Sequence, residues 1–232
     1  MRKIGFIGAY DKTDFVLYIA KILLEMGHRV LVVDATITQK ARYIVPNIQP
    51  ERSYITEFEG IDVAVGFKSF EDIKTYLRIP TMGQLQYDIA LIDTNSAGGV
   101  MSYKIQDSEK IYFVTSFDLY SIRRGIESLN GIQEKVNATK VLFSREVTSD
   151  ENNYLNYLSS GSNIIWNQQI IYMPFELGDQ TVIYKNQRVA KIRLRGLTNQ
   201  YKEGLMYIAV QLLGDENYPQ IRKVFKKIEK GV

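Results

Sequence analysis

Short, nearly uninterrupted apolar runs that each end at a polar turn constrain the fold of this chain more than any other feature. The clearest runs are residues 3–7, 29–34 and 86–93, and the last two end in Asp34 and Asp93. Runs of this kind are typical of parallel strands that are buried on both faces of a sheet. A helix is predicted directly after the first run, because apolar residues repeat at helical spacing from Phe15 to Met26 and Gly27 ends the pattern.

The same alternation of strand and helix continues along the chain. Further strands are predicted at residues 53–58, 61–67, 110–115, 139–143 and 164–173, and further helices at residues 67–77, 119–136, 152–160 and 197–213. Residues 35–50 have no clear period and are predicted to form a loop and a short helix. The predicted fold class is therefore α/β, a doubly wound, mostly parallel sheet with helices on both faces. We expect one domain over residues 1–214 and a C-terminal amphipathic helix over residues 215–232.

Composition excludes several classes of site. The chain has no cysteine, so it has neither disulfides nor thiolate metal ligands, and its single histidine, His28, is too few for a histidine metal site or a Ser-His-Asp triad. A net charge of +3 does not require a polyanionic partner. The apolar run at the N-terminus is too short for a signal peptide, and no other run reaches membrane-spanning length. We therefore expect a cytoplasmic protein.

The turn after the first predicted strand has the residue order of a phosphate-binding loop. It reads Gly8-Ala9-Tyr10-Asp11-Lys12-Thr13-Asp14, and Lys12 and Thr13 occupy the positions that hold phosphate and magnesium in a P-loop. Backbone amides at the start of a helix favour a bound phosphate. The motif departs from the usual pattern at Asp11, which replaces the glycine before the lysine. The Asp11 carboxylate opposes phosphate binding unless it turns outward or caps the helix.

The aspartates at the strand ends predict a magnesium site beside this loop. Magnesium bound between phosphates needs a carboxylate at the tip of a neighbouring strand, in direct contact or through water. Thr13, Asp34 and Asp93 are the predicted metal-binding residues, with Asp93 in the position of a Walker B aspartate and Asp34 near the attacking nucleophile. The alternative is that each aspartate simply caps the following helix.

With these residues in place, the chain resembles the ParA/MinD group of P-loop ATPases over nearly its full length. Residues 8–13, 30–35, 87–94, 114–123 and 173–176 are similar, in this order, to the Walker A loop, the strand before switch I, the Walker B strand, the segment after switch II and the loop beside the base. The resemblance implies ATP or ADP with Mg²⁺ as ligands, a homodimer, and a protein partner in a larger assembly. It also implies that Pro174 and Phe175 border the nucleotide base.

Two departures from this family affect the expected activity. The lysine that reaches across the family's dimer is replaced by Ile7, and the segment from Thr36 to Tyr43, which corresponds to switch I, contains no acidic residue. Hydrolysis needs positioned water and charge stabilisation, so binding with weak or no hydrolysis is expected. Atypical Walker A loops resemble the TadZ/CpaE branch, whose members position pilus or secretion machinery. An active ParA-type ATPase for DNA partitioning or membrane-associated positioning and a nucleotide-free scaffold remain alternatives.

Two basic segments offer further surfaces. Residues 218–230 form an amphipathic pattern, with membrane or DNA contacts predicted at Arg222, Lys223, Phe225, Lys226 and Lys227. Such a helix suits peripheral binding at the inner face of the membrane, or alternatively packs on its own domain with a solvated basic face. Lys185, Arg188, Lys191, Arg193 and Arg195 make a second basic cluster, which is compatible with nucleic-acid binding. The alternation of the last four predicts the outer face of an edge strand or extended loop.

Overall fold

A computed structural model of the protein describes residues 1–46, 52–80, 82–144, 149–174 and 176–230. Its centre is an eight-stranded sheet with the order β3-β4-β2-β5-β1-β6-β7-β8. All neighbouring strands pair in parallel except β3 and β4, which form an antiparallel hairpin. The strands are β1 (Arg2–Ile7), β2 (Val30–Asp34), β3 (Tyr54–Phe58), β4 (Ile61–Val65), β5 (Ile89–Thr94), β6 (Lys110–Ser116), β7 (Val136–Ser144) and β8 (Ile164–Pro174).

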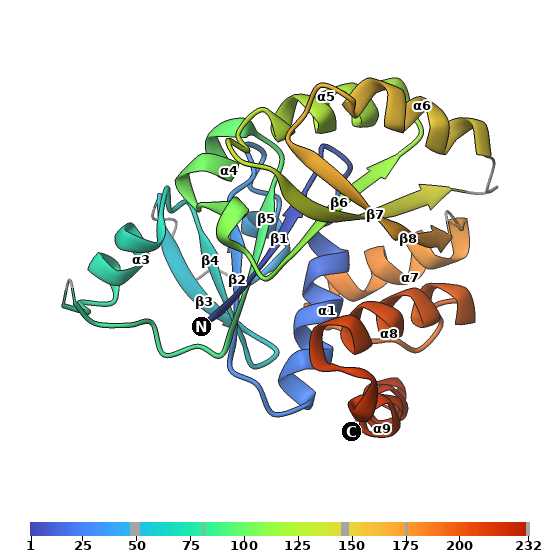
Figure 1. Ribbon diagram of the computed structural model, residues 1–232. Coiled ribbons are helices and arrows are strands. Elements are labelled where there is room, and N and C mark those ends of the chain that lie inside the picture. Colours follow the sequence, from blue (N-terminus) through green and yellow to red (C-terminus); the bar gives the residue numbers. More distant parts are fainter. Residues whose placement is uncertain (47–51, 81, 145–148, 175, 231–232) are drawn as a thin grey trace.

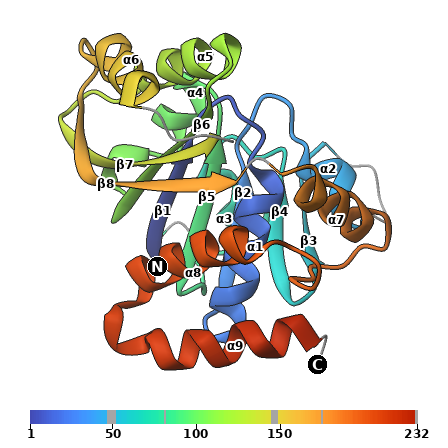
Figure 2. The same cartoon turned by 90° about the vertical axis from the view of Figure 1, so that its right-hand side faces the viewer.

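Helices cover both faces of this sheet, as Figures 1 and 2 show. On one face lie α1 (Thr13–Glu25), α2 (Ala41–Ile44), α7 (Leu177–Arg188), α8 (Asn199–Leu213) and α9 (Tyr218–Lys230). On the other face lie α3 (Phe70–Tyr76), α4 (Ala97–Ser102), α5 (Leu119–Leu129) and α6 (Ser149–Ser159). Two short 3-10 turns, η1 (Ile105–Asp107) and η2 (Asp215–Asn217), complete the described elements. The predicted doubly wound α/β fold is confirmed.

The register of the central strands brings the predicted site residues to one edge of the sheet. Phe6 on β1 and Asp34 on β2 both pair with Asp93 on β5, which lies between these two strands. The three strands therefore end at the same level, and the loop after β1 lies beside both aspartates. Ligands of open α/β sheets bind at this carboxyl edge.

Some predicted helix boundaries were wrong. The helix predicted over residues 119–136 ends at Leu129. Just beyond this end, Gly131 packs so closely on α4 that a Cβ there would lie 2.5 Å from the Ala97 carbonyl oxygen. Helix α4 was not predicted, although Ser96 caps it by accepting a hydrogen bond from the Gly99 amide at 3.1 Å. Its two glycines concealed the helical pattern.

The predicted edge strand or extended loop over residues 188–195 was also partly wrong. Lys185 and Arg188 lie in the last turn of α7, where the helix dipole favours basic side chains. Residues 191–195 are irregular, and Asn186 donates to the Arg193 carbonyl at 2.8 Å, which turns the chain back along the helix.

The C-terminal helix α9 packs on the domain. Ile221, Phe225 and Ile228 are buried in the core that α1 and α8 share. Lys227 forms an ion pair with Glu25 of α1 at 2.7 Å. The structure thus shows the packed alternative for this helix. It also corrects the membrane or DNA contact predicted at Phe225, because the ring of Phe225 faces α1 and α8 and does not lie on the surface. Within the described ranges, no helix combines the length and the apolar character needed to cross a membrane.

Candidate functional site

The loop between β1 and α1 forms the centre of the candidate site. Gly8 has φ +145°, and a Cβ there would lie 2.0 Å from the carbonyl oxygen of Val114, so the loop can pass β6 only with glycine at this position. The Gly8 amide donates to the Thr94 carbonyl at 3.1 Å. The amides of Ala9, Tyr10, Asp11 and Lys12 donate to no acceptor among the described residues. These free amides precede α1 and form a set of donors suited to a phosphate.

Lys12, Thr13 and Asp93 meet beneath this loop. The Lys12 ammonium lies 2.8 Å from Oδ1 of Asp93 and donates to the Gly8 carbonyl at 2.6 Å. The Thr13 hydroxyl donates to Oδ2 of Asp93 at 3.4 Å. Lys12 and Asp93 are each only 2% exposed. Burial raises the pKa of Asp93 to about 6, although the Lys12 charge opposes this rise.

The Asp93 carboxylate also passes a test of fit for a magnesium ion. Its Oδ1 atom is buried, and the Lys12 ammonium, at 2.8 Å, is its close polar partner among the described residues. An anionic oxygen with unused acceptor capacity, next to a threonine hydroxyl, is the donor set that magnesium prefers. The residues present therefore fit the Mg²⁺ that the sequence predicts.

Asp11 turns away from the free amides. Its Oδ1 atom accepts the Thr13 amide at 3.3 Å at the start of α1, and Oδ2 forms an ion pair with Lys40. The side chain is 53% exposed. An outward, helix-capping carboxylate leaves the amides of the loop accessible. The substitution of the usual glycine by Asp11 is thus compatible with phosphate binding at this loop.

Asp34 has a different role from the one predicted. Its Oδ1 atom accepts the amide and hydroxyl of Thr36 at 3.0 and 2.6 Å, and Oδ2 accepts the Ala41 amide at 2.9 Å. Asp34 does not line the cavity beside Lys12. No group of three or more acidic or histidine side chains suited to a metal occurs among the described residues. The prediction of Asp34 as a metal ligand is therefore corrected: its carboxylate holds the segment from Thr36 to Ala41 in place.

Two adjacent cavities extend from the loop. The first, about 390 Å³, is called the phosphate cavity below because the free amides and Lys12 border it. It is lined by Ala9, Tyr10, Asp11, Lys12, Thr13, Thr36, Thr38, Lys40, Tyr43, Asp93, Asn95 and Tyr120. The second, about 250 Å³, is called the aromatic cavity. Its lining includes Tyr10, Phe15, Phe143, Tyr184 and Tyr201.

Tyr10 connects the two cavities, since it lines both of them. Its ring stacks on Phe143 at the end of β7, with 4.5 Å between ring centroids. A flat ligand that enters the aromatic cavity meets ring faces and edges, which suit a heterocyclic base. Helix α7 supplies Asp179, Gln180, Ile183 and Tyr184 to the opposite wall.

Several of these residues were missed in the sequence. Lys40, Asn95, Tyr120 and the lining residues of α7 carry no local motif. The predicted base-side residue Pro174 ends β8 without lining either cavity, and Phe175 lies outside the described residues. For the lining residues of α7, the sequence offered one indication, which is their position directly after the loop that the resemblance places beside the base.

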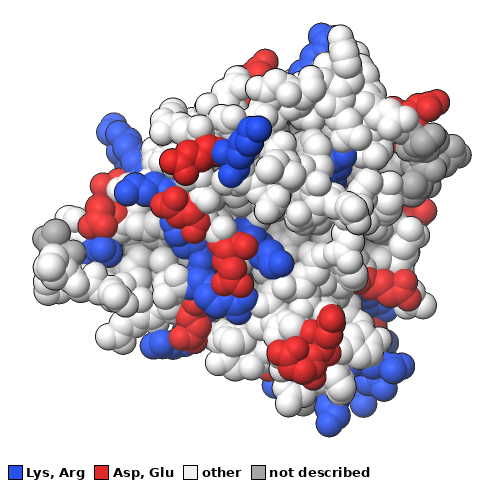
Figure 3. All heavy atoms as spheres, viewed as in Figure 1, with Lys and Arg blue, Asp and Glu red and all other residues white. Residues whose placement is uncertain are grey.

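The basic residues of α9 lie apart from these cavities. Arg222, Lys223, Lys226 and Lys227 are exposed on the outer side of the helix. Figure 3 shows Lys and Arg side chains gathered at the lower right, where Figure 1 places α9, whereas acidic and basic groups alternate over the upper left of this face. The predicted basic surface therefore exists, without the apolar residue Phe225.

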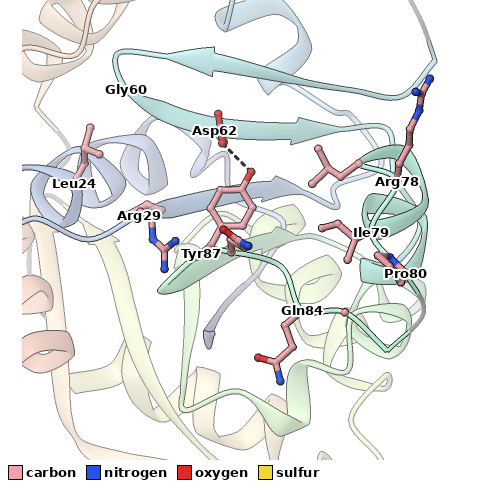
Figure 4. Close-up of a pocket in the computed structure, with 13 residues that line it drawn as sticks. Leu24, Arg29, Gly60, Asp62, Arg78, Ile79, Pro80, Gln84 and Tyr87 are labelled. Atoms are coloured by element: carbon pink, nitrogen blue, oxygen red, sulfur yellow. Dashed lines mark hydrogen bonds between the residues drawn. The ribbon is translucent and has the colours of Figure 1, made fainter.

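A larger cavity lies at the other edge of the sheet. It measures about 770 Å³ and is bordered by Leu24, Arg29, Asp62 and the segment from Leu77 to Tyr87, with Thr81 outside the described residues (Figure 4). The Tyr87 hydroxyl donates to Asp62 at 2.7 Å within it. None of the predicted site residues contributes to this cavity, which lies near the amino ends of the parallel strands β2 and β5.

Comparison with solved structures identifies the fold. Over 91% of its length the chain is similar to a ParA family ATPase from Chlorobium tepidum TLS, covering 98% of that chain with a TM-score of 0.60 and 16% identity. It is similar to a chain of the MinC:MinD cell division protein complex of Aquifex aeolicus, with a TM-score of 0.56, 16% identity, and 93% and 97% of the two chains covered.

A third similar structure contains a ligand. It is cobyrinic acid a,c-diamide synthase from Mycobacterium smegmatis with a bound ATP analog and magnesium, with a TM-score of 0.52, 16% identity, and 92% and 94% coverage. The sequence matches no protein-family model and no curated protein sequence. At this level of identity the similarities show the fold alone, and that fold is the mostly parallel α/β fold of ParA/MinD-type P-loop NTPases.

Proposed function

We propose that this protein binds ATP or ADP together with Mg²⁺ and acts as a nucleotide-dependent switch that positions or recruits another assembly. One observation carries the proposal. Lys12, Thr13 and Asp93 converge beneath the free amides of Ala9 to Lys12, at the carboxyl edge of the sheet. The ATP analog and magnesium in a structure of the same fold support this choice of ligand.

Each group has a defined task in this proposal. The free amides and Lys12 would bind phosphate oxygens, and Thr13 and Asp93 would hold the metal ion, Asp93 directly or through water. The bound Mg²⁺ would neutralise part of the phosphate charge. The aromatic cavity, with Tyr10 stacked on Phe143, would receive the base.

We further propose that hydrolysis is weak or absent. Ile7, at the position where the resembling family has its lysine, is fully buried and uncharged. In the segment facing the phosphate cavity, Thr36 uses its hydroxyl to bind Asp34, and no carboxylate lies between Thr36 and Tyr43. The site has more groups that can bind phosphate than groups that can activate water. We therefore expect the bound nucleotide to stay in place for a long time before it is hydrolysed.

A homodimer fits the surface around the phosphate cavity. Ile37, Tyr43, Leu119 and Tyr120 are all more than half exposed, and Tyr43 and Tyr120 line the cavity itself. Exposed large apolar side chains that gather around a binding site mark an interaction surface. We propose that nucleotide binding stabilises the association of two copies across this rim.

The cellular role proposed is that of a TadZ/CpaE-like positioning protein in the cytoplasm, with pilus or secretion machinery as the kind of partner. The basic outer face of α9, formed by Arg222, Lys223, Lys226 and Lys227, would attract an anionic membrane surface without unpacking the helix. Liposome flotation of the full chain and of a variant with these four residues changed to glutamine tests this surface. Equal partitioning of both proteins would remove the membrane from the proposal.

Binding of labelled ATP and ADP with Mg²⁺ tests the central proposal. Wild type is expected to bind, and Lys12→Ala is expected to lose at least tenfold in affinity because a phosphate contact is removed. Lys110→Ala is the matched control, since Lys110 is exposed at the amino end of β6, on the opposite edge of the sheet. Equal affinity of all three proteins would remove Lys12 from the site.

Steady-state ATP hydrolysis separates this proposal from an active ParA-type ATPase for DNA partitioning. The assay is run with and without DNA and anionic liposomes. We expect turnover to stay near background in each condition, and robust stimulated turnover would instead establish the active enzyme.

A nucleotide-free scaffold is the second candidate, and one observation favours it. Lys12 is already satisfied by Asp93 and the Gly8 carbonyl in a buried ion pair, so the structure needs no ligand to balance these charges. Two results together would decide in favour of the scaffold: mass spectrometry finds no nucleotide in the purified protein, and a titration shows no binding by wild type.

A further inference from the structure

Lys40 lies at the boundary between the phosphate cavity and the aromatic cavity. The two cavities share Tyr10, Asp11 and Lys40 in their linings. Among the described residues that line them, Lys12 and Lys40 are the only basic side chains. Lys12 comes from the phosphate-binding loop, whereas Lys40 comes from the segment just before α2. The site thus has a second cation from a different element.

The Lys40 ammonium bridges two carboxylates of the loop and of α1. It pairs with Oδ2 of Asp11 and with Oδ2 of Asp14 at 3.1 Å. Burial lowers the pKa of Lys40, but the charges of Asp14 and Asp11 raise it overall, so the side chain remains an ammonium ion at neutral pH. Without this cation, a nucleotide that spans the two cavities would meet the unneutralised charges of Asp11, which lines both cavities, and of Asp14, which lines the aromatic cavity.

Each carboxylate has another donor besides Lys40. Asp11 accepts the Thr13 amide at 3.3 Å, and Asp14 accepts both 3.0 and 2.8 Å hydrogen bonds from Gln187 of α7. Because these contacts do not involve Lys40, the ammonium can leave either carboxylate without stripping it of hydrogen bonds. The side chain is 30% exposed, which leaves it room to reorient.

The backbone that carries Lys40 is fixed beside the cavity. The next residue, Ala41, donates its amide to Asp34 at 2.9 Å, and Asp34 also binds both donors of Thr36. A long side chain on an anchored backbone can change partners by rotation of its own bonds alone. Lys40 can therefore reach a ligand in either cavity without rearrangement of the segment.

We propose that Lys40 is a second phosphate-binding residue, which exchanges the Asp11 and Asp14 carboxylates for phosphate oxygens when a nucleotide binds. This inference rests on the proposed function, because its ligand is the same magnesium nucleotide. It adds a second cation to a site that is bordered by the two acids Asp11 and Asp14. It also connects phosphate binding to the segment that carries the exposed residues Ile37 and Tyr43.

A double-mutant cycle between Lys40 and Asp11 tests the contact. The affinity for Mg²⁺ with labelled ATP is measured for wild type, Lys40→Ala, Lys40→Gln, Asp11→Asn and the Asp11→Asn/Lys40→Ala pair. Lys110→Ala is the control for loss of a positive charge, and thermal unfolding of each protein verifies the fold. Lys40→Gln removes the charge but keeps most of the side chain, in case Lys40→Ala disturbs the segment.

The expected result is a loss of about tenfold or more for both Lys40 variants, and a few-fold gain for Asp11→Asn, which frees the ammonium. The Lys40→Ala change must still cost about tenfold in the Asp11→Asn background. If the double variant binds as well as Asp11→Asn alone, Lys40 only neutralises Asp11 and the proposal is overturned. The proposal is also overturned if wild type binds, Lys12→Ala does not, and both Lys40 variants bind as well as wild type. If wild type itself does not bind, the proposed function is overturned.

Discussion

Removal of Lys12 should reveal how costly the buried charges of the site are for the fold. The side chains of Lys12 and Asp93 are 1% and 3% exposed, with 2.8 Å between the ammonium nitrogen and Oδ1. Lys12→Ala leaves the Asp93 carboxylate buried without its cation. Breaking a buried pair in this way costs about 3–5 kcal/mol, so we expect a loss of that order in the free energy of unfolding at pH 8.

The pH dependence of this loss follows from Asp93. Burial raises its pKa from the ordinary 3.8 to about 6, which corresponds to roughly 3 kcal/mol against the ionised form in the folded state. Because the folded state holds this proton more tightly than the unfolded chain, the contribution of Asp93 to stability falls as the pH rises from about 4 to about 6. Without Lys12 the pKa of Asp93 should rise further. The difference between Lys12→Ala and wild type should therefore be greatest at pH 8 and smaller at pH 5.

Urea denaturation followed by circular dichroism at these two pH values measures the effect. The matched control is the Lys12→Met/Asp93→Asn pair, which removes both charges and keeps most of the side-chain volume. It should recover to within about 1 kcal/mol of wild type, since neutral replacement of a buried pair costs little. A Lys12→Ala protein as stable as wild type at pH 8, or a double variant no more stable than the single one, would refute this reasoning.

Three further outcomes are expected. Affinity for Mg²⁺ with ATP should fall about fivefold between pH 6 and pH 5 in wild type, because the pKa of Asp93 is about 6 and its protonation removes a metal ligand; Asp93→Asn should bind weakly at both values by calorimetry. Gly8→Ala should prevent folding, because its Cβ would lie 2.0 Å from a carbonyl oxygen, whereas Gly98→Ala, with no atom within 4 Å, should raise stability by about 0.5–1 kcal/mol in thermal unfolding. Phe225→Ala should destabilise the protein by about 3–5 kcal/mol in urea, and Lys226→Ala by less than about 0.5 kcal/mol; similar losses for both would contradict the packing of α9.

The order of the elements and the residues of the loop could be predicted from the sequence. Apolar runs such as residues 29–34 fix buried strands, and parallel strands joined by helices must end at a common edge. This rule alone brings Lys12 and Thr13 next to Asp93. Helices α4 and α7 were missed because glycine in α4 and an almost uniform mixture of polar and apolar residues in α7 conceal helical periodicity.

The roles of individual polar side chains could not be predicted in the same way. Asp34 and Asp93 are both aspartates at the ends of neighbouring strands, so the sequence alone predicts both of them as metal ligands. They differ in the structure because amides of the following segment satisfy Asp34, whereas Asp93 is paired with the Lys12 ammonium and the Thr13 hydroxyl beneath the loop.

The sequence by itself thus determined the α/β alternation and the position of the loop after β1 beside Asp93, because these depend on local patterns and on a topological rule. Only the tertiary structure decided the direction of Asp11, the position of Lys40 between two cavities, and the burial of Phe225 against α1 and α8. These features depend on contacts between residues far apart in the chain, where packing and charge select one partner among several that the sequence allows.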